Sequence, residues 1–256
     1  MEIYHRLRAL FSKQTSRNPN LIQQGSLFPA KTSPGSISPP DGAITALIFQ
    51  RIIEDNFRIA DLGSGPCGAF WWSQLPKGCS INAFDLYNEP QNTFDYVSFS
   101  KKDVTKLHEA RKLKGKFHLV VADHIFEHVK APSGLASSIF HILQPNGYLH
   151  VGIPDASNFT DRFYRLIHPD GGGHIQQFTR DSFLKFITAY GFELIEEKPW
   201  PDDWRWFEKL YSLDYYKVQH LTKEEKVWIA NVFRKELTPE KGYSYGWEFL
   251  FSKEGR

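Results

Sequence analysis

The sequence predicts an α/β fold with a doubly wound, mostly parallel sheet, and two observations carry this prediction. Segments of strand character alternate with segments of helical character from residue 57 to residue 153, which is the order that a parallel sheet requires. The run Phe117–Asp123 is apolar almost throughout, as suits a strand buried on both faces of such a sheet. At 256 residues, the chain can form one large domain with a full core.

Composition excludes several classes of protein. The formal charge of +2 argues against nucleic acid or an acidic membrane as the main partner. The two cysteines, Cys67 and Cys79, are too few for a disulfide scaffold or a cysteine-based zinc site, and they fit a reducing compartment. No apolar run reaches the length of about 18 residues that could span a bilayer, and no secretory signal is visible. We therefore expect a cytoplasmic protein without membrane contact.

The N-terminal part is expected to stand apart from the domain. Residues 1–14 place apolar side chains at helical spacing, so they predict an amphipathic helix that either packs on the domain or forms a lid over a ligand. Residues 15–40 contain several prolines and show no periodicity, which indicates a linker. The domain is then expected over residues 41–256, starting with a helix over 41–55 that Asp41 caps.

A glycine-rich turn follows the first predicted strand. The apolar residues of 57–62 lead into Gly63, Ser64 and Gly65, and Pro66 suits the first turn of a short helix over about 67–75. Glycines in this position let a ligand approach the backbone, and free N–H groups at a helix start favour an anion. This pattern alone does not identify the ligand.

The remaining elements follow from apolar periodicity and turn residues. Strands are predicted over 80–85, 96–99, 117–123 and 148–153, with helices over 104–113 and 133–143. After these come a helix over about 179–190, a strand over 192–197 and a last strand over 245–251. The aromatic segment 199–243 predicts either an ordinary helical packing face or an insertion that walls an acceptor pocket or forms a dimer surface.

Four aspartates each follow or end a predicted strand. Asp61 and Asp85 end the first two strands, Asp103 follows the third, and Asp123 ends the fourth. Parallel sheets bind ligands at the carboxyl ends of their strands, near the switch point in strand order. Asp85 lies about 20 residues beyond the glycines, where an acid can accept both hydroxyls of a ribose. Asp103 could accept a hydrogen bond from an exocyclic amine.

These features together resemble the class I S-adenosylmethionine-dependent methyltransferases over roughly residues 41–198 and the last strand. The similar segments are Asp61–Gly68, Asp85, Asp103–Val104, Ala122–Val129, Leu143–Leu149 and Tyr190–Phe192. The resemblance implies a seven-stranded Rossmann-like sheet with an antiparallel last strand and helices on both faces. Asn146 stands where the family has a glycine, which is tolerable because asparagine also visits left-handed backbone conformations.

The resemblance also implies S-adenosylmethionine as cofactor, with the ribose on Asp85 and the adenine beside Asp103 and Val104. The expected cofactor-binding residues are Asp61, Gly63, Ser64, Gly65, Asp85, Leu86, Asp103, Val104, Asp123, His124 and Ile125. A nicotinamide cofactor is the alternative, because Gly63, Gly65 and Gly68 also fit the spacing G-x-G-x-x-G. The acid after the third strand and the Glu–His pair after the fourth favour S-adenosylmethionine.

A metal site is not predicted. His124, Glu127 and His128 match the inverted zinc-protease pattern H-x-x-E-H, but that chemistry needs both histidines on one face of a helix. Here they follow a buried strand, and Pro132 disfavours a helix that continues past them. Glu127 and His128 could instead line the cofactor or only brace their loop. Asp170 and His174 could hold a metal, but two ligands are too few to predict one.

The acceptor is expected near the loop that follows the fifth strand. Residues 168–178 contain three glycines between two histidines, and a hydroxyl acceptor needs a base that takes its proton. We therefore predict His174 and His128 as catalytic or acceptor-contacting residues, with structural turns as the alternative for His174. The predicted function is methyl transfer to a small molecule, at a hydroxyl of a secondary metabolite or sugar-like compound. The chain could form a homodimer, and the alternative function is a non-catalytic partner module.

Overall fold

The computed structural model describes residues 52–66, 70–91, 94–158, 161, 164–165, 173–201, 222–227, 231 and 244–255. The predicted N-terminal helix or lid, the linker and most of the predicted helix over 41–55 lie outside these residues. So does most of the aromatic segment 199–243.

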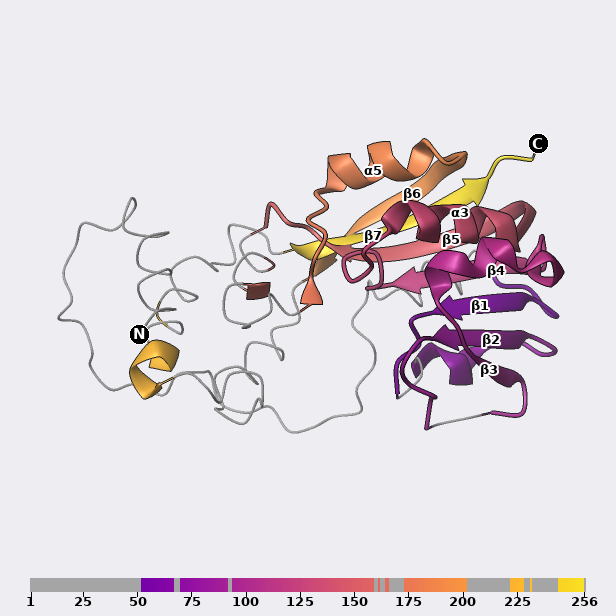
Figure 1. Ribbon diagram of the computed structural model, residues 1–256, viewed down its shortest axis with the longest axis horizontal. Coiled ribbons are helices and arrows are strands. Elements are labelled where there is room, and N and C mark those ends of the chain that lie inside the picture. The colour runs from indigo at the N-terminus through magenta and orange to yellow at the C-terminus, as the bar shows by residue number, and fades with distance from the viewer. Residues whose placement is uncertain are drawn as a thin grey trace.

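One seven-stranded sheet forms the centre of the described protein, in the order β3-β2-β1-β4-β5-β7-β6 (Figure 1). Its strands are β1 (Arg58–Leu62), β2 (Ser80–Asp85), β3 (Val97–Lys101), β4 (Phe117–Asp123), β5 (Leu143–Pro154), β6 (Phe192–Pro201) and β7 (Ser244–Lys253). Pairing is parallel from β3 through to β5, and β7 runs antiparallel to both β5 and β6. The predicted fold class, with its antiparallel last strand, is confirmed.

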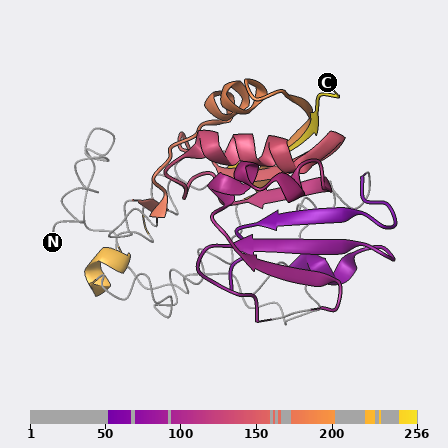
Figure 2. The same cartoon turned by 45° about the vertical axis from the view of Figure 1, so that its right-hand side comes forward.

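The strand order reverses beside β1. The chain moves outward from β1 to β2 and β3, then returns to the other side of β1 with β4 and continues to β5. The carboxyl ends of these parallel strands point to one edge of the sheet (Figure 2). The loops after β1 and β4 therefore leave in opposite directions from adjacent strands, which is where open α/β sheets form ligand sites.

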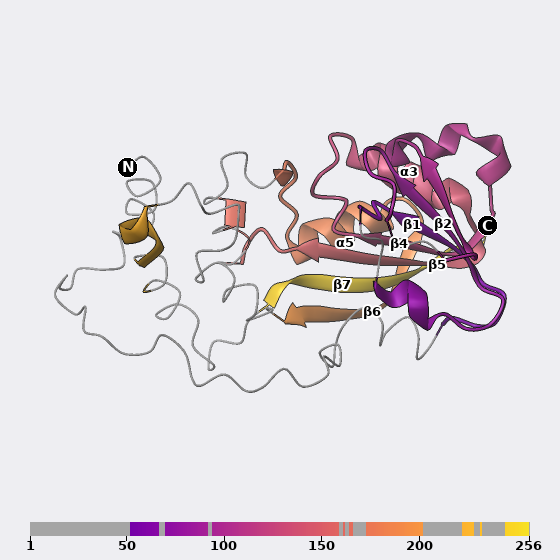
Figure 3. The ribbon, with the colours of Figure 1, turned by 90° about the horizontal axis from the view of Figure 1, so that it is seen from below.

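Each face of the sheet has its own apolar core. The larger core joins the sheet to the α-helices α3 (Pro132–Ile142) and α5 (Arg180–Thr188) and to the 3₁₀ helix η2 (Val104–Glu109). The smaller core lies on the other face, where the 3₁₀ helix η1 (Phe70–Gln74) contributes Trp71 and Trp72. Figure 3 shows α3 above the strands and the violet η1 below them. Both faces are covered, as the sequence predicted.

Three predicted helices differ from the structure. Residues 52–55 are described and are not helical. Of the helix predicted over 67–75, the described residues 70–75 contain only the five-residue η1, and the helix predicted over 104–113 is η2 followed by the 3₁₀ helix η3 (Arg111–Leu113). A 3₁₀ helix suits such short segments because its hydrogen bonds span three residues rather than four. Apolar spacing does not distinguish one or two 3₁₀ turns from a short α-helix.

β5 starts at Leu143, immediately after α3 and five residues before the predicted strand. Its first residues include Asn146, whose φ of 58° is left-handed, as the sequence predicted for the position that takes glycine in the family. Within the described part of the chain, we find no helix with the length and apolar character needed to cross a membrane.

Candidate functional site

The turn after β1 brings backbone close to the strand ends. Gly63 and Gly65 have φ values of 76° and 65°, so both positions favour glycine. Gly63 N–H donates to the Phe84 carbonyl at 2.7 Å, which ties the turn to β2. A Cβ atom on Gly63 would lie 2.8 Å from Ile125 Cδ1, whereas one on Gly65 would meet nothing within 4 Å. Ile125, from the loop after β4, therefore lies against Gly63 and leaves Gly65 open.

Asp85 at the end of β2 connects this turn to the next loop. Its Oδ2 accepts a hydrogen bond from Gly65 N–H at 3.1 Å. Its Oδ1 accepts from the backbone N–H groups of Tyr87 and Asn88, both at 2.8 Å. The carboxylate is thus held beside the glycine turn in a fixed orientation, as a ribose-binding acid must be. Leu86, the next residue, exposes 40% of its surface.

Asp61 lies near the end of β1, the strand next to the one that Asp85 ends. Asp61 is buried, and its Oδ2 accepts from Trp72 Nε1 at 2.8 Å. Burial raises the pKa of Asp61 to about 7; the Trp72 hydrogen bond opposes this, and the negative charges of Asp123 and Asp85 add to it. Asp61, Asp85 and Asp123 lie at the carboxyl ends of the adjacent strands β1, β2 and β4, so their negative charges repel one another. A cationic ligand would relieve that repulsion.

Two buried polar atoms beside the turn lack a partner. Ser64 Oγ and Asp123 Oδ1 have no hydrogen bond with any residue that the structure describes. Burial raises the pKa of Asp123, the positive charge of His124 lowers it, and Glu127 raises it further. Buried polar atoms normally have partners, so these two fit donors of a bound ligand. S-adenosylmethionine carries a cationic sulfonium and an ammonium group, and it therefore suits this acidic site.

Asp103 and Val104 are placed differently from the other predicted cofactor residues. Asp103 caps η2: its Oδ1 accepts from Thr105 N–H at 3.0 Å and from the Thr105 hydroxyl at 2.6 Å. Val104 is buried in the larger core. Lys102 N–H donates to the Asp85 carbonyl at 3.1 Å, so this turn starts next to β2. Their contact with an adenine stays a prediction.

The loop after β4 is a series of turns and not a helix. His124 has a left-handed φ of 50°, and its Nδ1 lies 2.8 Å from Glu127 Oε1. Burial opposes protonation of His124, but the hydrogen bond to Glu127 and the charges of Asp123, Glu127 and Glu248 raise its pKa to about 9. Burial alone would raise the pKa of Glu127, but the hydrogen bond to His124 and the charges of His124 and His128 have the larger effect, so the pKa is lowered. His124 and Glu127 therefore form an ion pair at neutral pH.

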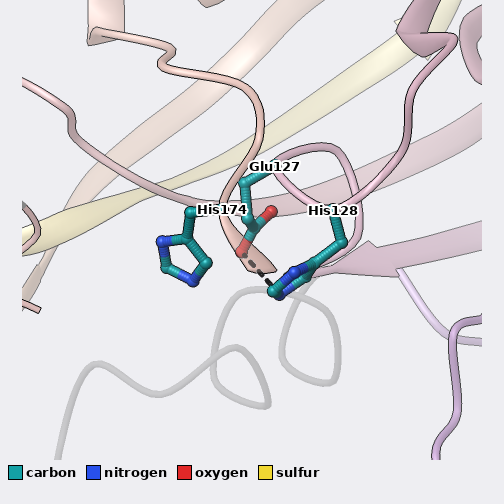
Figure 4. A group of neighbouring side chains, drawn as sticks. All are labelled: Glu127, His128 and His174. Carbon is teal, nitrogen blue, oxygen red and sulfur yellow. Dashed lines mark ion pairs between the residues drawn. The ribbon is translucent and has the colours of Figure 1, made fainter. Parts of the chain in front are cut away.

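The segment 173–177 is bound to this loop. Gln176 donates through its N–H to the Glu127 carbonyl and through its side chain to the Val129 carbonyl, both at 3.0 Å. His128 Nδ1 lies 3.0 Å from the Gly173 carbonyl, and the rings of His128 and His174 meet edge to face at 4.9 Å. The structure thus brings together the two predicted catalytic histidines (Figure 4). Burial lowers the pKa of His128, although Glu127 opposes it, so this imidazole is neutral near pH 7.

Sequence reasoning missed three residues that support His174. Asp161 Oδ1 lies 2.9 Å from His174 Nδ1, and Arg165 Nε lies 2.9 Å from Asp161 Oδ2. The Tyr164 ring stacks on the His174 ring at 4.7 Å. Asp161 and Arg165 are four residues apart, the spacing of an ion pair on one helix face. This spacing can be seen in the sequence and indicates an ion pair, but nothing in the sequence indicates that the pair contacts His174.

The carboxyl edge of the sheet can therefore hold two kinds of ligand. Asp61, Asp85 and Asp123 suit a cationic cofactor with a ribose, and the histidine pair lies where the loop after β4 contacts the segment 173–177. Glu127, His128 and His174 each offer one ligand atom, and these atoms lie within 4.8 Å of one another. A metal ion could bind there.

Several solved structures share this fold. A S-adenosylmethionine-dependent methyltransferase from Archaeoglobus fulgidus is 17% identical with a TM-score of 0.55, over 82% of this chain and 93% of that one. One from Methanosarcina mazei is 16% identical with a TM-score of 0.53, over 82% and 98%. The phosphoethanolamine N-methyltransferase 2 of Haemonchus contortus, in complex with phosphomonomethylethanolamine and S-adenosylhomocysteine, is 15% identical with a TM-score of 0.56, over 83% and 52%.

No curated protein matches the chain. The family model described as "Methyltransferase domain" matches residues 39–197, which include the strands from β1 to β5, the glycine turn and the histidine pair. The strand order and the antiparallel β7 agree with that match. The chain therefore belongs to the methyltransferase domain family and is a class I S-adenosylmethionine-dependent methyltransferase.

Proposed function

We propose that this methyltransferase acts on a hydroxyl group of a small molecule, such as a secondary metabolite or a sugar-like compound. The observation that carries this proposal is the paired arrangement of His128 and His174 at the edge of the cofactor region. A hydroxyl must lose its proton as its oxygen takes the methyl group, and an imidazole is the side chain best suited to take it near neutral pH.

In this proposal the aspartates hold the cofactor. The backbone N–H groups of Gly65, Tyr87 and Asn88 leave some lone pairs of the Asp85 carboxylate free. Through these lone pairs, Asp85 accepts hydrogen bonds from the ribose hydroxyls. Asp103 accepts a hydrogen bond from the adenine amine. Asp61 and Asp123 face the cationic part. The glycine turn allows close approach, with Gly63, Ser64, Gly65, Leu86, Val104, His124 and Ile125 as further contacts. The Ser64 hydroxyl and the unpaired Asp123 oxygen support this assignment.

The hydrogen bonds of His174 support its role as base or acceptor contact. Its Nδ1–H donates to the Asp161 carboxylate, so the lone pair is on Nε2. If Nε2 takes the acceptor proton, the nearby negative charge of Asp161 stabilises the imidazolium, as a carboxylate does for a catalytic histidine. Arg165 fixes the carboxylate in turn. His128 lines the same site with its own Nε2. Bringing acceptor oxygen and methyl carbon into line supplies much of the rate gain.

Labelled S-adenosylmethionine and a metabolite extract test the proposal, because the labelled product identifies the acceptor. Calorimetry should show binding of S-adenosylmethionine or S-adenosylhomocysteine in the micromolar range, lost in Asp85→Ala. His174→Ala should keep cofactor binding and lose transfer. His141→Ala is the matched control, since His141 lies at the end of α3 and its Nε2 is 3.4 Å from the Ala110 carbonyl. A product labelled at nitrogen or carbon would refute the hydroxyl assignment.

The other expectations also enter as proposals. We infer a cytoplasmic protein that does not bind nucleic acid and could form a homodimer. The acceptor-wall or dimer role of segment 199–243 falls mostly outside the described residues, as does the possible lid over 1–40.

A further inference from the structure

Three side chains from two segments converge at the acceptor side. Glu127 and His128 come from the loop after β4, and His174 comes from the segment that leads to α5 (Figure 4). Their ligand atoms lie within 4.8 Å of one another. Ligands about 2.1 Å from a tetrahedral zinc ion are roughly 3.4 Å apart. Side-chain shifts of about 1 Å would therefore complete such a site.

Both imidazoles are fixed in the tautomer that binds metal. The Gly173 carbonyl can only accept a hydrogen bond, so His128 Nδ1 must carry the proton. His174 Nδ1 likewise donates to the Asp161 carboxylate. The lone pair of each ring is then on Nε2, and neither Nε2 makes a hydrogen bond with the described residues. Metal-bound histidines characteristically donate their other ring N–H to a carboxylate or carbonyl oxygen, and here both do.

Glu127 supplies an unpartnered buried oxygen. The residue is 1% exposed. Its Oε1 is 2.8 Å from His124 Nδ1 and 3.9 Å from His128 Nε2. Its Oε2 has no hydrogen-bond partner among the residues that the structure describes. A buried carboxylate oxygen without a hydrogen-bond donor is energetically costly unless a cation or another ligand binds it. The two neighbouring Nε2 atoms carry no proton, so they cannot donate a hydrogen bond to this oxygen.

We propose that Glu127, His128 and His174 bind a divalent transition-metal ion through one carboxylate oxygen and two Nε2 atoms. Two imidazoles and a carboxylate suit zinc, manganese, iron or cobalt, and three protein ligands leave a coordination position open. The role of the ion rests on the function proposed above, but its binding does not. The open position takes the acceptor hydroxyl. With the ion bound, the histidines hold the ion, and the ion acidifies the hydroxyl; in the metal-free protein, His174 takes the proton as proposed above.

The chemistry balances without another reactant. The cation lowers the pKa of the coordinated hydroxyl, which releases its proton to solvent. An oxygen lone pair then forms the bond to the methyl carbon, and the carbon–sulfur bond breaks with its electron pair going to sulfur. The products are the methyl ether, S-adenosylhomocysteine and one proton.

Zinc titration of the chelator-treated, full-length protein tests the site. Calorimetry should show one zinc ion per chain. Glu127→Gln and His174→Ala should each weaken binding more than about 100-fold, because removing a ligand should exceed the roughly 10–100-fold loss typical of a second-shell change. Asp161→Asn should fall within that smaller range, and His141→Ala should match wild type. Absence of zinc binding, or equal affinity in all these variants, would overturn the proposal.

Two further measurements separate this proposal from misfolding and from the proposed function. Binding of S-adenosylhomocysteine reports folding, so a variant that keeps it and loses zinc supports the site. If the variants lose both, the visible spectrum of the cobalt-loaded wild type decides: bands of cobalt bound through protein nitrogen support the site, and bands of the hydrated ion alone refute it. Cofactor binding without zinc binding refutes the metal site and leaves the proposed function standing. Zinc binding without methyl transfer supports the metal site and refutes the proposed function.

Discussion

The two halves of the site are built in different ways. In the half proposed to bind the cofactor, Asp61 and Asp85 lie at the ends of adjacent strands, and Gly65 donates to Asp85 across 20 residues of chain. In the half proposed to bind the acceptor, His128 contacts Gly173 across 45 residues. The first half is formed by strand ends and one turn, whereas the second is formed by contacts between two loops. Variants should therefore separate cofactor binding from transfer.

Loss of the His174 imidazole should have the largest effect. His174→Ala should lower the methyl-transfer rate by about 10²–10⁴-fold, the usual contribution of a positioned acid or base, while the affinity for S-adenosylhomocysteine stays within about twofold of wild type. Single-turnover assays with the identified acceptor measure the rate, and calorimetry measures the affinity. Equal loss in both would mean that the two halves are not separable.

Asp85→Ala should have the opposite profile. It removes a charged acceptor of two ribose hydroxyls, each worth about 1.5–3 kcal/mol, so the cofactor should bind about 100-fold or more weakly. Transfer at saturating cofactor should fall much less. Asp181→Ala is the control, since that carboxylate is 85% exposed on α5. Unchanged cofactor affinity in Asp85→Ala would contradict the placement of the ribose.

Asp61 should couple stability to pH. Because burial raises its folded pKa from 3.8 to about 7, the folded state holds a proton that the unfolded state releases, and stability falls as pH rises from about 4 to about 7. Asp61→Asn keeps an acceptor for Trp72 and removes this titration. It should match wild type near pH 4 and exceed it at pH 8 by a few kcal/mol. Urea unfolding at both pH values measures the difference, and no gain at pH 8 would argue against the raised pKa.

The two glycines of the turn offer a smaller and matched comparison. Both have left-handed φ values, so alanine costs about 1–2 kcal/mol at either. Gly63→Ala also places Cβ against Ile125 Cδ1, whereas Gly65→Ala meets nothing. Gly63→Ala should therefore lower the unfolding free energy by roughly 1 kcal/mol more than Gly65→Ala. Equal losses would show that Ile125 moves aside without cost.

The same contrast explains what could be predicted from the sequence. The apolar runs predicted all seven strands. The acids at strand ends predicted that Asp61 and Asp85 lie near each other, because the carboxyl ends of parallel strands meet at one edge of the sheet. Asn146 was predicted correctly, since its left-handed backbone is a local property. The 3₁₀ character of η1 and η2 was not, because spacing alone does not set the hydrogen-bond pattern over five or six residues.

The support for His174 could not be predicted. His174 itself was marked by the glycines around it, but its contacts with Asp161 and Tyr164 depend on how segments outside the regular elements pack. Nor did the sequence place His174 beside Glu127 and His128. The H-x-x-E-H pattern was correctly predicted to lie in a loop. His174, which joins Glu127 and His128 in the cluster, lies 46 residues beyond His128 in the chain. Such a cluster becomes visible only in three dimensions.

The most direct test of the two-part site is calorimetry and methyl transfer on Asp85→Ala and His174→Ala side by side. We predict that Asp85→Ala binds S-adenosylhomocysteine about 100-fold or more weakly, while His174→Ala binds it like wild type and transfers the methyl group at least about 100-fold more slowly. Full cofactor binding by Asp85→Ala, or undiminished transfer by His174→Ala, would contradict the account.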